Sequence, residues 1–328
     1  MNSPHPVSRR DFLRTSASAL AAAPFSFAAT STAEPIIDIH QHTNYGGKRN
    51  TAWEQIFPAR SHDDLRAHQR GMGVTTTLLL PAGRQVLRDS THQGRSNGLE
   101  GTVSGNEDCL QLTRKYPGEF VFGANEVSDL ADAPAVVEKY LKLGAILIGE
   151  QKFGVECDAD AMQRLYQLAD AYRVPILMHW QVGSYNYGFE RFHQMLKKYP
   201  KVNFIGHAQT WWANIHQGYI NDPKNLYPLG AVKAGGLTDR YLSDFPNMFA
   251  DLSAGSGENA FKRDHEHARG FFARHQDKLL FGSDCSDSTG VAAACSGARQ
   301  IAQIHAFAPN KTAARKILHD NAKKLFRI

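Results

Sequence analysis

The sequence predicts an α/β protein with a (β/α)8 (TIM) barrel, and three observations support this fold class. Eight short apolar runs recur along the chain, and segments with apolar residues at intervals of three and four lie between them. No glycine-rich phosphate turn follows the first run. Short buried strands that alternate with helices form parallel βαβ units, and eight such units in about this length close into a barrel. An open doubly wound sheet is the alternative, and it would usually carry the glycine-rich turn.

The predicted strands are Ile36 to Gln41, Val74 to Leu80, Phe120 to Asn125, Ala145 to Glu150, Val174 to His179, Val202 to His207, Met248 to Ser253 and Lys278 to Ser283. The predicted helices include Asp132 to Leu143, Ala159 to Tyr172, Phe189 to Tyr199 and Glu258 to His275. Two long insertions interrupt this alternation, Pro81 to Cys109 and Thr210 to Pro228. The first is long for a loop, and we expect it to lie over the barrel mouth.

Residues 1–33 have the features of a cleaved export signal of the twin-arginine kind. The adjacent Arg9 and Arg10 precede an alanine-rich apolar stretch from Ala17 to Ala29, which small residues follow. The stretch is too short and too rich in Ser and Ala to remain as a transmembrane helix. We therefore expect the twin-arginine export machinery as a partner, and a single mature domain, residues 34–328, that is periplasmic or secreted and not inserted in a membrane.

Composition narrows the function classes. Removal of residues 1–33 takes away three arginines and one aspartate, which lowers the formal net charge from +5 to +3. This small charge argues against a dedicated nucleic-acid or membrane surface and leaves a small-molecule substrate as the expected partner. The cysteines at 109, 157, 285 and 295 show no metal-finger or redox spacing. A Cys285–Cys295 disulfide and buried free thiols both remain open.

Metal-capable side chains stand at the C-terminal ends of five predicted strands, which is where barrel enzymes place their chemistry. His40 and His42 end the first strand, and two residues separated by one project the same way, so they can hold one ion. The ends of strands 4, 5, 6 and 8 add Glu150, His179, His207 and Asp284. Imidazole and carboxylate ligands suit a borderline divalent ion, with zinc as the first expectation.

This ordered set resembles the amidohydrolase superfamily, in its amidohydrolase-related (amidohydrolase 2) branch of metal-dependent TIM-barrel hydrolases. The resemblance runs from Asp38-Ile39-His40-Gln41-His42 through Gly206-His207 to Gly282-Ser283-Asp284, and residues 317–326 resemble the closing helix of many relatives. It implies that His40 and His42 ligate the metal with Asp284. In mononuclear decarboxylase-like relatives the strand-5 histidine is a ligand and the strand-6 histidine acts on the substrate, and those roles would fall on His179 and His207.

The resemblance leaves the number of ions, one or two, open. In binuclear relatives a carboxylate or a carboxylated lysine at the end of strand 4 bridges two ions, which would recruit Glu150 or Lys152, and His179 and His207 would then ligate the second ion. Ile148-Gly149-Glu150 is similar to the strand-4 ending of TatD-related hydrolases, whose glutamate is a ligand. The alternative is that Glu150 only pairs with Lys152, because the two side chains face the same way on an extended segment.

The expected activity is hydrolysis of a small carbonyl-type substrate (a lactone, an amide or another ester) by water that the metal activates. Asp284 is expected to bind the metal and move the proton, and His207 to stabilise the oxyanion with the metal. Asp38 and Asp251 are candidate supporting groups. The first alternative is nonoxidative decarboxylation of a small aromatic or unsaturated carboxylate with the same ligands, and the second is a noncatalytic metal binder.

Substrate contacts are only weakly indicated. Basic side chains that follow strands 1 and 2 are candidates for meeting an anionic group, or are simply solvated: Lys48, Arg49, Arg84 and Arg88. Aromatic side chains that follow strands 5 and 6 either contact a substrate or pack a loop onto the barrel: Trp180, Trp211, Trp212, Tyr185 and Tyr187. His265 and His267 lie two apart in a predicted helix, do not share a face, and are expected to be solvated.

Overall fold

The computed structural model describes residues 34–43, 60–97, 103–287, 290–291 and 295–328. The predicted export signal, and with it the cleavage site, lies outside these residues, as do Lys48 and Arg49. Residues Glu34–Ile328 form one compact unit. Within the described part of the chain, no helix combines the length and apolar character that a membrane span requires.

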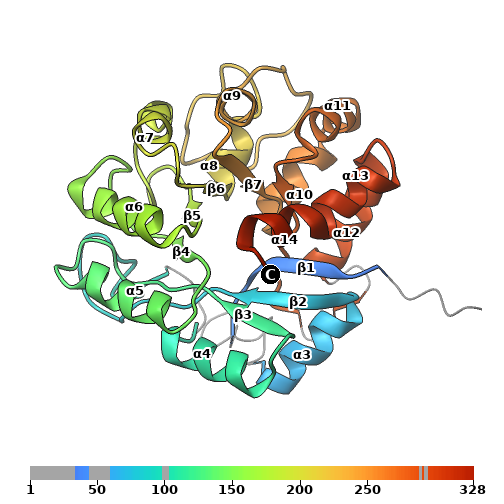
Figure 1. Ribbon diagram of the computed structural model, residues 1–328. Helices are drawn as coiled ribbons and strands as arrows, with labels where there is room; N and C mark the ends of the chain where they lie inside the picture. Colours follow the sequence, from blue (N-terminus) through green and yellow to red (C-terminus); the bar gives the residue numbers. More distant parts are fainter. Residues whose placement is uncertain (1–33, 44–59, 98–102, 288–289, 292–294) are drawn as a thin grey trace, which may run out of the picture. The chain divides into compact units, whose positions relative to one another are not determined.

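Eight parallel strands follow one another in sequence order around the barrel (Figure 1). They are β1 (Ile36–Gln41), β2 (Val74–Leu79), β3 (Phe120–Phe122), β4 (Ile148–Gln151), β5 (Ile176–His179), β6 (Phe204–His207), β7 (Met248–Asp251) and β8 (Leu279–Leu280). Strands β1 to β3 pair in one sheet and β4 to β8 in another. Backbone hydrogen bonds link the sheets at both edges, from Gly149 N to Ala124 O (2.9 Å) and from Ile39 N to Phe281 O (3.0 Å). The predicted (β/α)8 fold class is confirmed.

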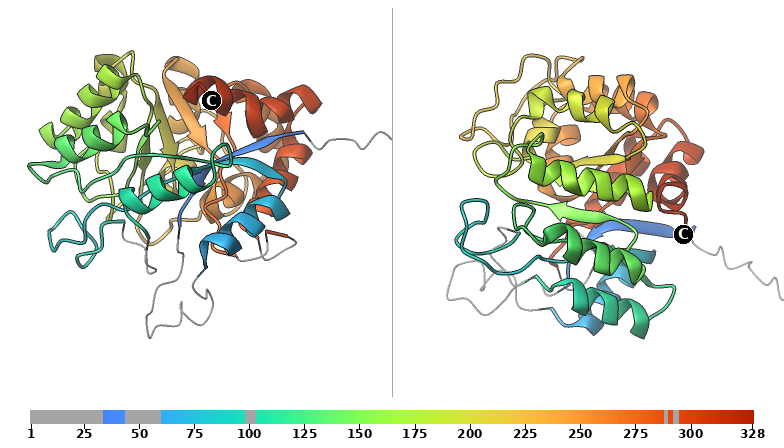
Figure 2. Two further views of the ribbon diagram at one scale, coloured as in Figure 1. Left: turned by 60° about the horizontal axis from the view of Figure 1, so that its bottom comes forward. Right: turned by 60° about the vertical axis from the view of Figure 1, so that its left-hand side comes forward.

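Helices surround the strands on the outside (Figures 1 and 2). They are α3 (His62–Gly71), α4 (Asn106–Lys115), α5 (Ala133–Lys142), α6 (Asp160–Tyr172), η1 (Phe189–Arg191), α7 (His193–Lys198), α8 (Gln209–Ala213), α9 (Leu237–Asp244), α10 (Ala254–Lys262), α11 (His265–His275), α12 (Ser296–Phe307), α13 (Lys311–Arg315), η2 (Lys316–Asp320) and α14 (Asn321–Phe326).

Two predicted helices are wrong in their continuity. The segment predicted as one helix from Glu258 to His275 contains α10 and α11, because Asp264 caps a new helix by accepting a hydrogen bond from His267 N (3.0 Å). The segment Phe189 to Tyr199 contains the 3₁₀ turn η1 and the short helix α7. An apolar period of three to four residues continues across such breaks, so the pattern alone does not reveal them.

Several strands are shorter than predicted, and β8 shows why. Its ladder stops at Leu280, because the next backbone donors are used elsewhere: Phe281 N donates to Ile317 O (3.1 Å) and Ser283 N to the Asp38 carboxylate (2.9 Å). Residues 281–283 therefore lie outside the strand. The hydrogen bonds of Phe281 and Ser283 thus fix the backbone immediately before Asp284.

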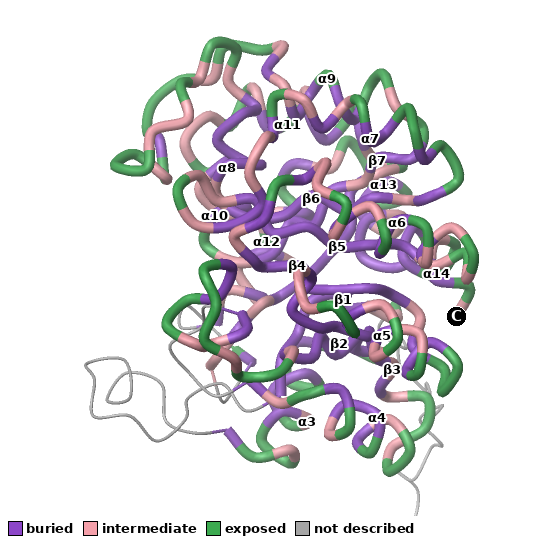
Figure 3. The backbone as a smooth tube through the Cα atoms, turned by 90° about the vertical axis from the view of Figure 1, so that its left-hand side faces the viewer, coloured by how far each residue is buried: buried purple, intermediate pink, exposed green. Residues whose placement is uncertain are grey.

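Apolar side chains from five strands and from Leu147, just before β4, fill the barrel interior, and α14 contributes Ala322 and Phe326 to this cluster. The interior side chains are Ile37, Ile39, Leu78, Leu80, Leu147, Leu177, Ile205 and Leu280. A larger apolar cluster lies between the strands and the outer helices, and the strands are buried throughout most of their length (Figure 3). A dry interior of this kind rigidly fixes the C-terminal strand ends, where the polar residues begin.

Candidate metal centre

Five of the six predicted ligands converge at the C-terminal ends of the strands. The distance from His42 Nε2 to Glu150 Oε2 is 3.4 Å, and His40 Nε2 lies 3.7 Å from both Glu150 Oε2 and Asp284 Oδ1. His207 Nε2 lies 3.7 Å from Glu150 Oε1. These distances are too long for good hydrogen bonds. Two donors that are each about 2.1 Å from one tetrahedral ion lie about 3.4 Å apart, so the spacing suits ligands that share an ion.

The rings of His40 and His42 are oriented by acceptors on the side away from this cluster. His40 Nδ1 donates to Asp251 Oδ2 (2.6 Å), and His42 Nδ1 donates to the backbone oxygen of Leu80 (2.8 Å). A proton on Nδ1 leaves the lone pair of Nε2 facing the carboxylates. Both rings are therefore fixed in the tautomer that binds a metal through Nε2.

Ser253 fixes the ring of His207, and its place at the end of the seventh predicted strand is the only feature of the sequence that could have indicated this. Its Oγ donates to Asp251 Oδ2 (2.9 Å) and lies 3.0 Å from His207 Nδ1. Because the serine proton is used on the carboxylate, Oγ accepts from His207 Nδ1–H. His207 therefore also presents the lone pair of Nε2, and Asp251, predicted only as a supporting group, coordinates two of the three histidine orientations.

The buried carboxylates make the centre strongly favourable for positive charge. Among the described residues, neither His40 Nε2 nor Glu150 Oε2 has a hydrogen-bond partner, although both are buried. Burial lowers the pKa of His40, but the surrounding carboxylates, Asp284 foremost, raise it to about 10. A proton and a metal ion compete for such a nitrogen. Buried nitrogen and oxygen atoms that lack a hydrogen-bond partner and lie among carboxylates suit a divalent cation bound by imidazole and carboxylate.

Asp284 differs from the other ligands in its exposure and backbone. Its side chain is 17% exposed, whereas that of Glu150 is 1% exposed. Burial raises the pKa of Asp284, but the charges of His40 and His42 outweigh this and lower it to about 2. Its backbone has a positive φ of 41°, and its N–H donates to His40 O (2.8 Å). The carboxylate is thus ionised and stands on the open side of the cluster.

Gly282 allows the chain before Asp284 to approach the first strand closely. A Cβ at this position would lie 2.4 Å from Asp251 Oδ1 and 2.8 Å from His40 Cβ. Any side chain would therefore displace the Asp251–His40 pair. The glycine of the Gly282-Ser283-Asp284 run has a direct role in forming the site.

His179 stands apart from the ligand groups. Its Nδ1 lies 2.5 Å from Glu150 Oε1, and its Nε2 lies 3.3 Å from Gln181 Oε1. The structure thus uses His179 to hold the glutamate. Lys152, the alternative strand-4 ligand, is buried with its Nζ 5.6 Å from the Tyr185 ring, and its positive charge helps to lower the pKa of Glu150 against the effect of burial.

Asp38 lies behind the cluster, as a supporting group and not a ligand. Its carboxylate accepts hydrogen bonds from His40 N (3.0 Å), from Ser283 Oγ (2.5 Å) and from Gln69 Nε2 (2.8 Å). The pairing of β1 with β2 is irregular between Asp38 and Gln41. Asp38 is thus a supporting group, as the sequence predicts, because its carboxylate is used by these three donors.

The side chains that the sequence only weakly indicated as substrate contacts pair with, or pack against, other residues of the protein. Arg84 is 47% exposed and pairs with Glu126 (2.9 Å) and Asp132 (2.5 Å). Trp180 and Trp211 are fully buried, and both rings pack against Phe189. The aromatic-packing alternative therefore describes these two tryptophans, because neither ring is open to a ligand in this structure.

The two helical histidines differ from each other. His265 is exposed, as predicted. The prediction of a solvated side chain is wrong for His267, which is half-buried, and burial lowers its pKa. The break at Asp264 places His267 in the first turn of α11, where its ring lies 5.8 Å from that of Phe271.

Comparison with solved structures identifies proteins of similar fold. No family model matches the sequence, and a search of curated proteins finds no significant match. Among solved structures, an uncharacterized TIM-barrel protein from Bordetella bronchiseptica is similar with a TM-score of 0.59 and 15% identity, over 89% of this chain and 98% of that one. A 5-carboxyvanillate decarboxylase from Novosphingobium aromaticivorans with bound manganese has a TM-score of 0.55 and 12% identity, over 91% and 98% of the two chains.

A protein from Acinetobacter baumannii named probable 2-pyrone-4,6-dicarboxylic acid hydrolase has a TM-score of 0.52 and 12% identity, over 89% of this chain and 99% of that one. The names of these neighbours include both a decarboxylase and a probable hydrolase. At such low identity the similarity establishes the architecture and not the reaction. The chain has a (β/α)8-barrel fold, as the TIM-barrel protein from Bordetella bronchiseptica does.

Proposed function

We propose that the protein is a metal-dependent hydrolase of the amidohydrolase superfamily that acts on a small carbonyl-type substrate such as a lactone, an amide or another ester. The observation that carries this proposal is the convergence of three histidine Nε2 atoms on the Glu150 and Asp284 carboxylates. A divalent ion held there would lower the pKa of its bound water toward about 7 and polarise a carbonyl group.

Asp284 is suited to move the proton in this reaction. Its pKa of about 2 keeps the carboxylate ionised at neutral pH, and it is the most exposed of the candidate ligands. A carboxylate in that position accepts a proton from water and returns it to the leaving group. Asp284 would then serve as both base and acid, and no second acidic side chain is needed.

Of the two roles expected for His207 from the sequence, metal ligand and oxyanion stabiliser, its protonation favours the first. Burial and the charge of His40 lower its pKa to about 3, so the ring is neutral, and its single proton lies on Nδ1 toward Ser253. An oxyanion needs a donor, and Nε2 has only a lone pair to offer. We therefore assign His207 as a ligand or proton acceptor.

One ion is favoured over two. The two ligand groups of this centre, His40–His42–Asp284 and His40–Glu150–His207, share His40. A single Nε2 lone pair binds one ion, and the Nε2 of His179, which a second ion would use, lies beside Gln181 Oε1 at 3.3 Å. Zinc suits the histidine-rich donor set, and manganese is the alternative.

A nonoxidative decarboxylase is the second candidate, and the pairing of Glu150 Oε1 with His179 at 2.5 Å favours it. In the decarboxylase alternative Glu150 would be left without a metal, and this pairing already occupies one of its two carboxylate oxygens. The fold similarity to a decarboxylase agrees with it.

A substrate screen tests both candidates. The protein is purified with its metal and assayed against lactones, amides, phosphoesters and aromatic carboxylates, with hydrolysis followed by proton release and decarboxylation by carbon dioxide release. Lactone, amide or ester turnover supports the proposal. Carbon dioxide release without hydrolysis of any of these classes contradicts it and supports the second candidate.

For residues 1–33 we propose twin-arginine export, which the motif at Arg9 and Arg10 supports. In the Arg9→Lys/Arg10→Lys double variant, the uncleaved chain should accumulate in the cytoplasm. Fractionation with an antibody measures this, and undiminished export of the variant would contradict the proposal.

A further inference from the structure

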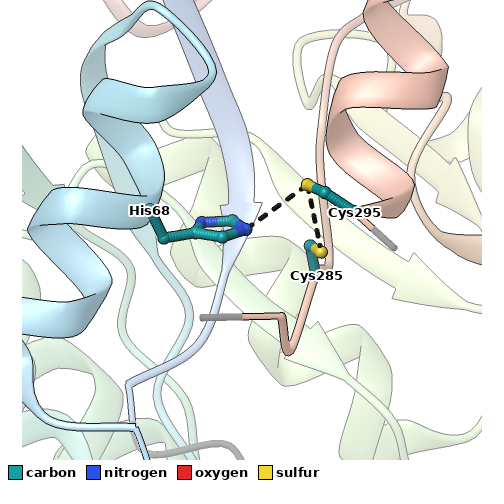
Figure 4. A group of neighbouring side chains, drawn as sticks. All are labelled: His68, Cys285 and Cys295. Atoms are coloured by element: carbon teal, nitrogen blue, oxygen red, sulfur yellow. Dashed lines mark hydrogen bonds between the residues drawn. The ribbon is translucent and has the colours of Figure 1, made fainter. Parts of the chain in front are cut away.

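A second buried cluster lies outside the candidate metal centre (Figure 4). His68 comes from α3, Cys285 from the segment after β8, and Cys295 from the position that caps α12. Cys295 Sγ lies 3.4 Å from Cys285 Sγ and 3.4 Å from His68 Nε2. All three side chains are buried, so three elements bring their nitrogen and sulfur donors to one point in the interior.

The orientation of His68 is fixed from behind. Gln69 Nε2 donates to Asp38 Oδ2 and to Thr77 Oγ1, both at 2.8 Å, so Gln69 Oε1 faces His68 Nδ1 at 3.1 Å and accepts its proton. The Nε2 lone pair of His68 is therefore directed at the thiols. Ligating histidines usually have such a hydrogen-bonded second nitrogen, which sets the tautomer.

A fourth soft atom closes the cluster. Met72 Sδ lies 3.5 Å from Cys295 Sγ. Gly297 makes room for it, because a Cβ at that position would lie 2.5 Å from Met72 Sδ. Two thiols, one imidazole and one thioether are thus gathered, and thiolate with imidazole is the donor set of structural zinc sites.

The distances agree with coordination better than with a disulfide. A Zn–S distance of about 2.3 Å and a Zn–N distance of about 2.0 Å place tetrahedral donors about 3.5–3.8 Å apart. The Cys285–Cys295 and His68–Cys295 pairs, each at 3.4 Å, therefore need to open by only a few tenths of an ångström. A disulfide requires the two sulfurs to approach to about 2.05 Å, and it would leave the lone pair of His68 without a use.

We propose that His68, Cys285 and Cys295 bind a zinc-class metal ion, with Met72 covering its fourth side, as a structural site separate from the candidate metal centre. The two thiol protons are released when the ion binds, and burial implies that the ion enters as the chain folds. Cys285 directly follows Asp284, and its backbone oxygen accepts from Gln41 Nε2 (3.1 Å), the residue between His40 and His42. The ion thereby anchors the segment that carries Asp284 to α3.

Cobalt substitution tests the site independently of activity. The full chain is produced in cobalt-supplemented medium, purified under reducing conditions, and examined for the near-ultraviolet absorption of a thiolate-to-cobalt bond. The candidate metal centre has no thiolate, so this band reports only the proposed site. We expect the band in the wild type and in Cys109→Ser, a buried cysteine outside the cluster, and its loss in Cys285→Ser and Cys295→Ser.

The His40→Ala/His42→Ala variant separates the two sites, because it should lose the other ion and keep the thiolate band. X-ray absorption on the zinc-loaded wild type needs no variant, and should show sulfur neighbours at about 2.3 Å. Absence of the band and of sulfur neighbours, or a band that persists in both cysteine variants, would overturn the proposal. Recovery of a Cys285–Cys295 disulfide that does not bind cobalt after reduction would overturn it as well.

Discussion

Asp251 Oδ2 lies 2.6 Å from His40 Nδ1, so a carboxylate at the end of β7 orients a ligand at the end of β1. The same oxygen accepts from Ser253 Oγ, which in turn holds His207. Two histidines on different strands thus depend on one buried carboxylate that is not itself among the candidate ligands. The metal-binding tautomers are a property of this network as much as of the ligands.

Replacement of Asp251 by asparagine should weaken metal binding by about 10- to 100-fold with the fold retained, because the amide cannot hold the proton of His40 as a carboxylate does. Metal titration against a competing chelator measures the affinity. Asp239→Asn is the matched control. Asp239 also bonds a histidine (His275, 2.5 Å), but that histidine, unlike His40, belongs to no candidate ligand group. Equal metal affinity in the wild type and Asp251→Asn would contradict the orienting role.

Ser253→Ala should lower kcat by about tenfold and leave KM nearly unchanged, because it removes the acceptor that fixes the tautomer of His207 without touching a substrate-facing group. Steady-state kinetics on the substrate found in the screen measures both constants. Ser256→Ala, a buried serine of α10, serves as the control. If Ser253→Ala changes KM alone, Ser253 contacts the substrate and the present assignment fails.

Trp180 and Trp212 provide a test of whether the buried tryptophans pack the core or contact the substrate. Trp180 Nε1 has no hydrogen-bond partner among the described residues, whereas Trp212 Nε1 donates to Asp251 O (3.0 Å). Both rings are buried, so each change to phenylalanine loses similar packing, and Trp212→Phe should be about 1 kcal/mol more destabilising because it also loses a hydrogen bond. Urea unfolding measures the difference. A raised KM with unchanged stability in Trp180→Phe would instead place that ring at the substrate.

Asp239 predicts a pH dependence of stability. Burial raises the pKa of Asp239, but the hydrogen bond from His275 and the charge of Arg274 lower it to about 2, below its usual 3.8. A depressed pKa stabilises the fold above about pH 4, and this stabilisation is lost as the pH falls through about 2. Asp239→Asn should therefore cost about 1–2 kcal/mol near neutral pH, after allowance for solvent screening, and much less at pH 2. A difference that is constant across this range would contradict the linkage.

The sequence predicted the strands and the polar side chains that converge at their C-terminal ends, because each signal is local. An apolar run followed by a polar side chain indicates its own position in the barrel. It did not predict the role of Ser253, because nothing in the sequence around this serine distinguishes it from other serines that follow an apolar residue. The cluster of His68 with Cys285 and Cys295 was likewise hidden, because positions separated by more than two hundred residues meet only after the barrel has formed.

Other differences come from tertiary context. Trp180 and Trp211 follow strands and so looked accessible at the barrel mouth, but the loops and helices of the described chain bury them. Histidine tautomers depend on acceptors such as Leu80 O and Asp251, which belong to other strands. Such features are set by packing between elements and not by the residue pattern of one element.

The most direct test of the central claim is removal and return of the metal. The purified protein is treated with a chelator, and its metal content and its hydrolysis of the best substrate are measured before treatment, after it, and after addition of zinc or manganese. We predict that activity falls in proportion to the metal of the candidate metal centre, about one equivalent beyond the ion assigned to His68, Cys285 and Cys295, and returns with it. In His42→Ala neither that equivalent nor the activity should return. Full hydrolytic activity in protein without metal would contradict the account.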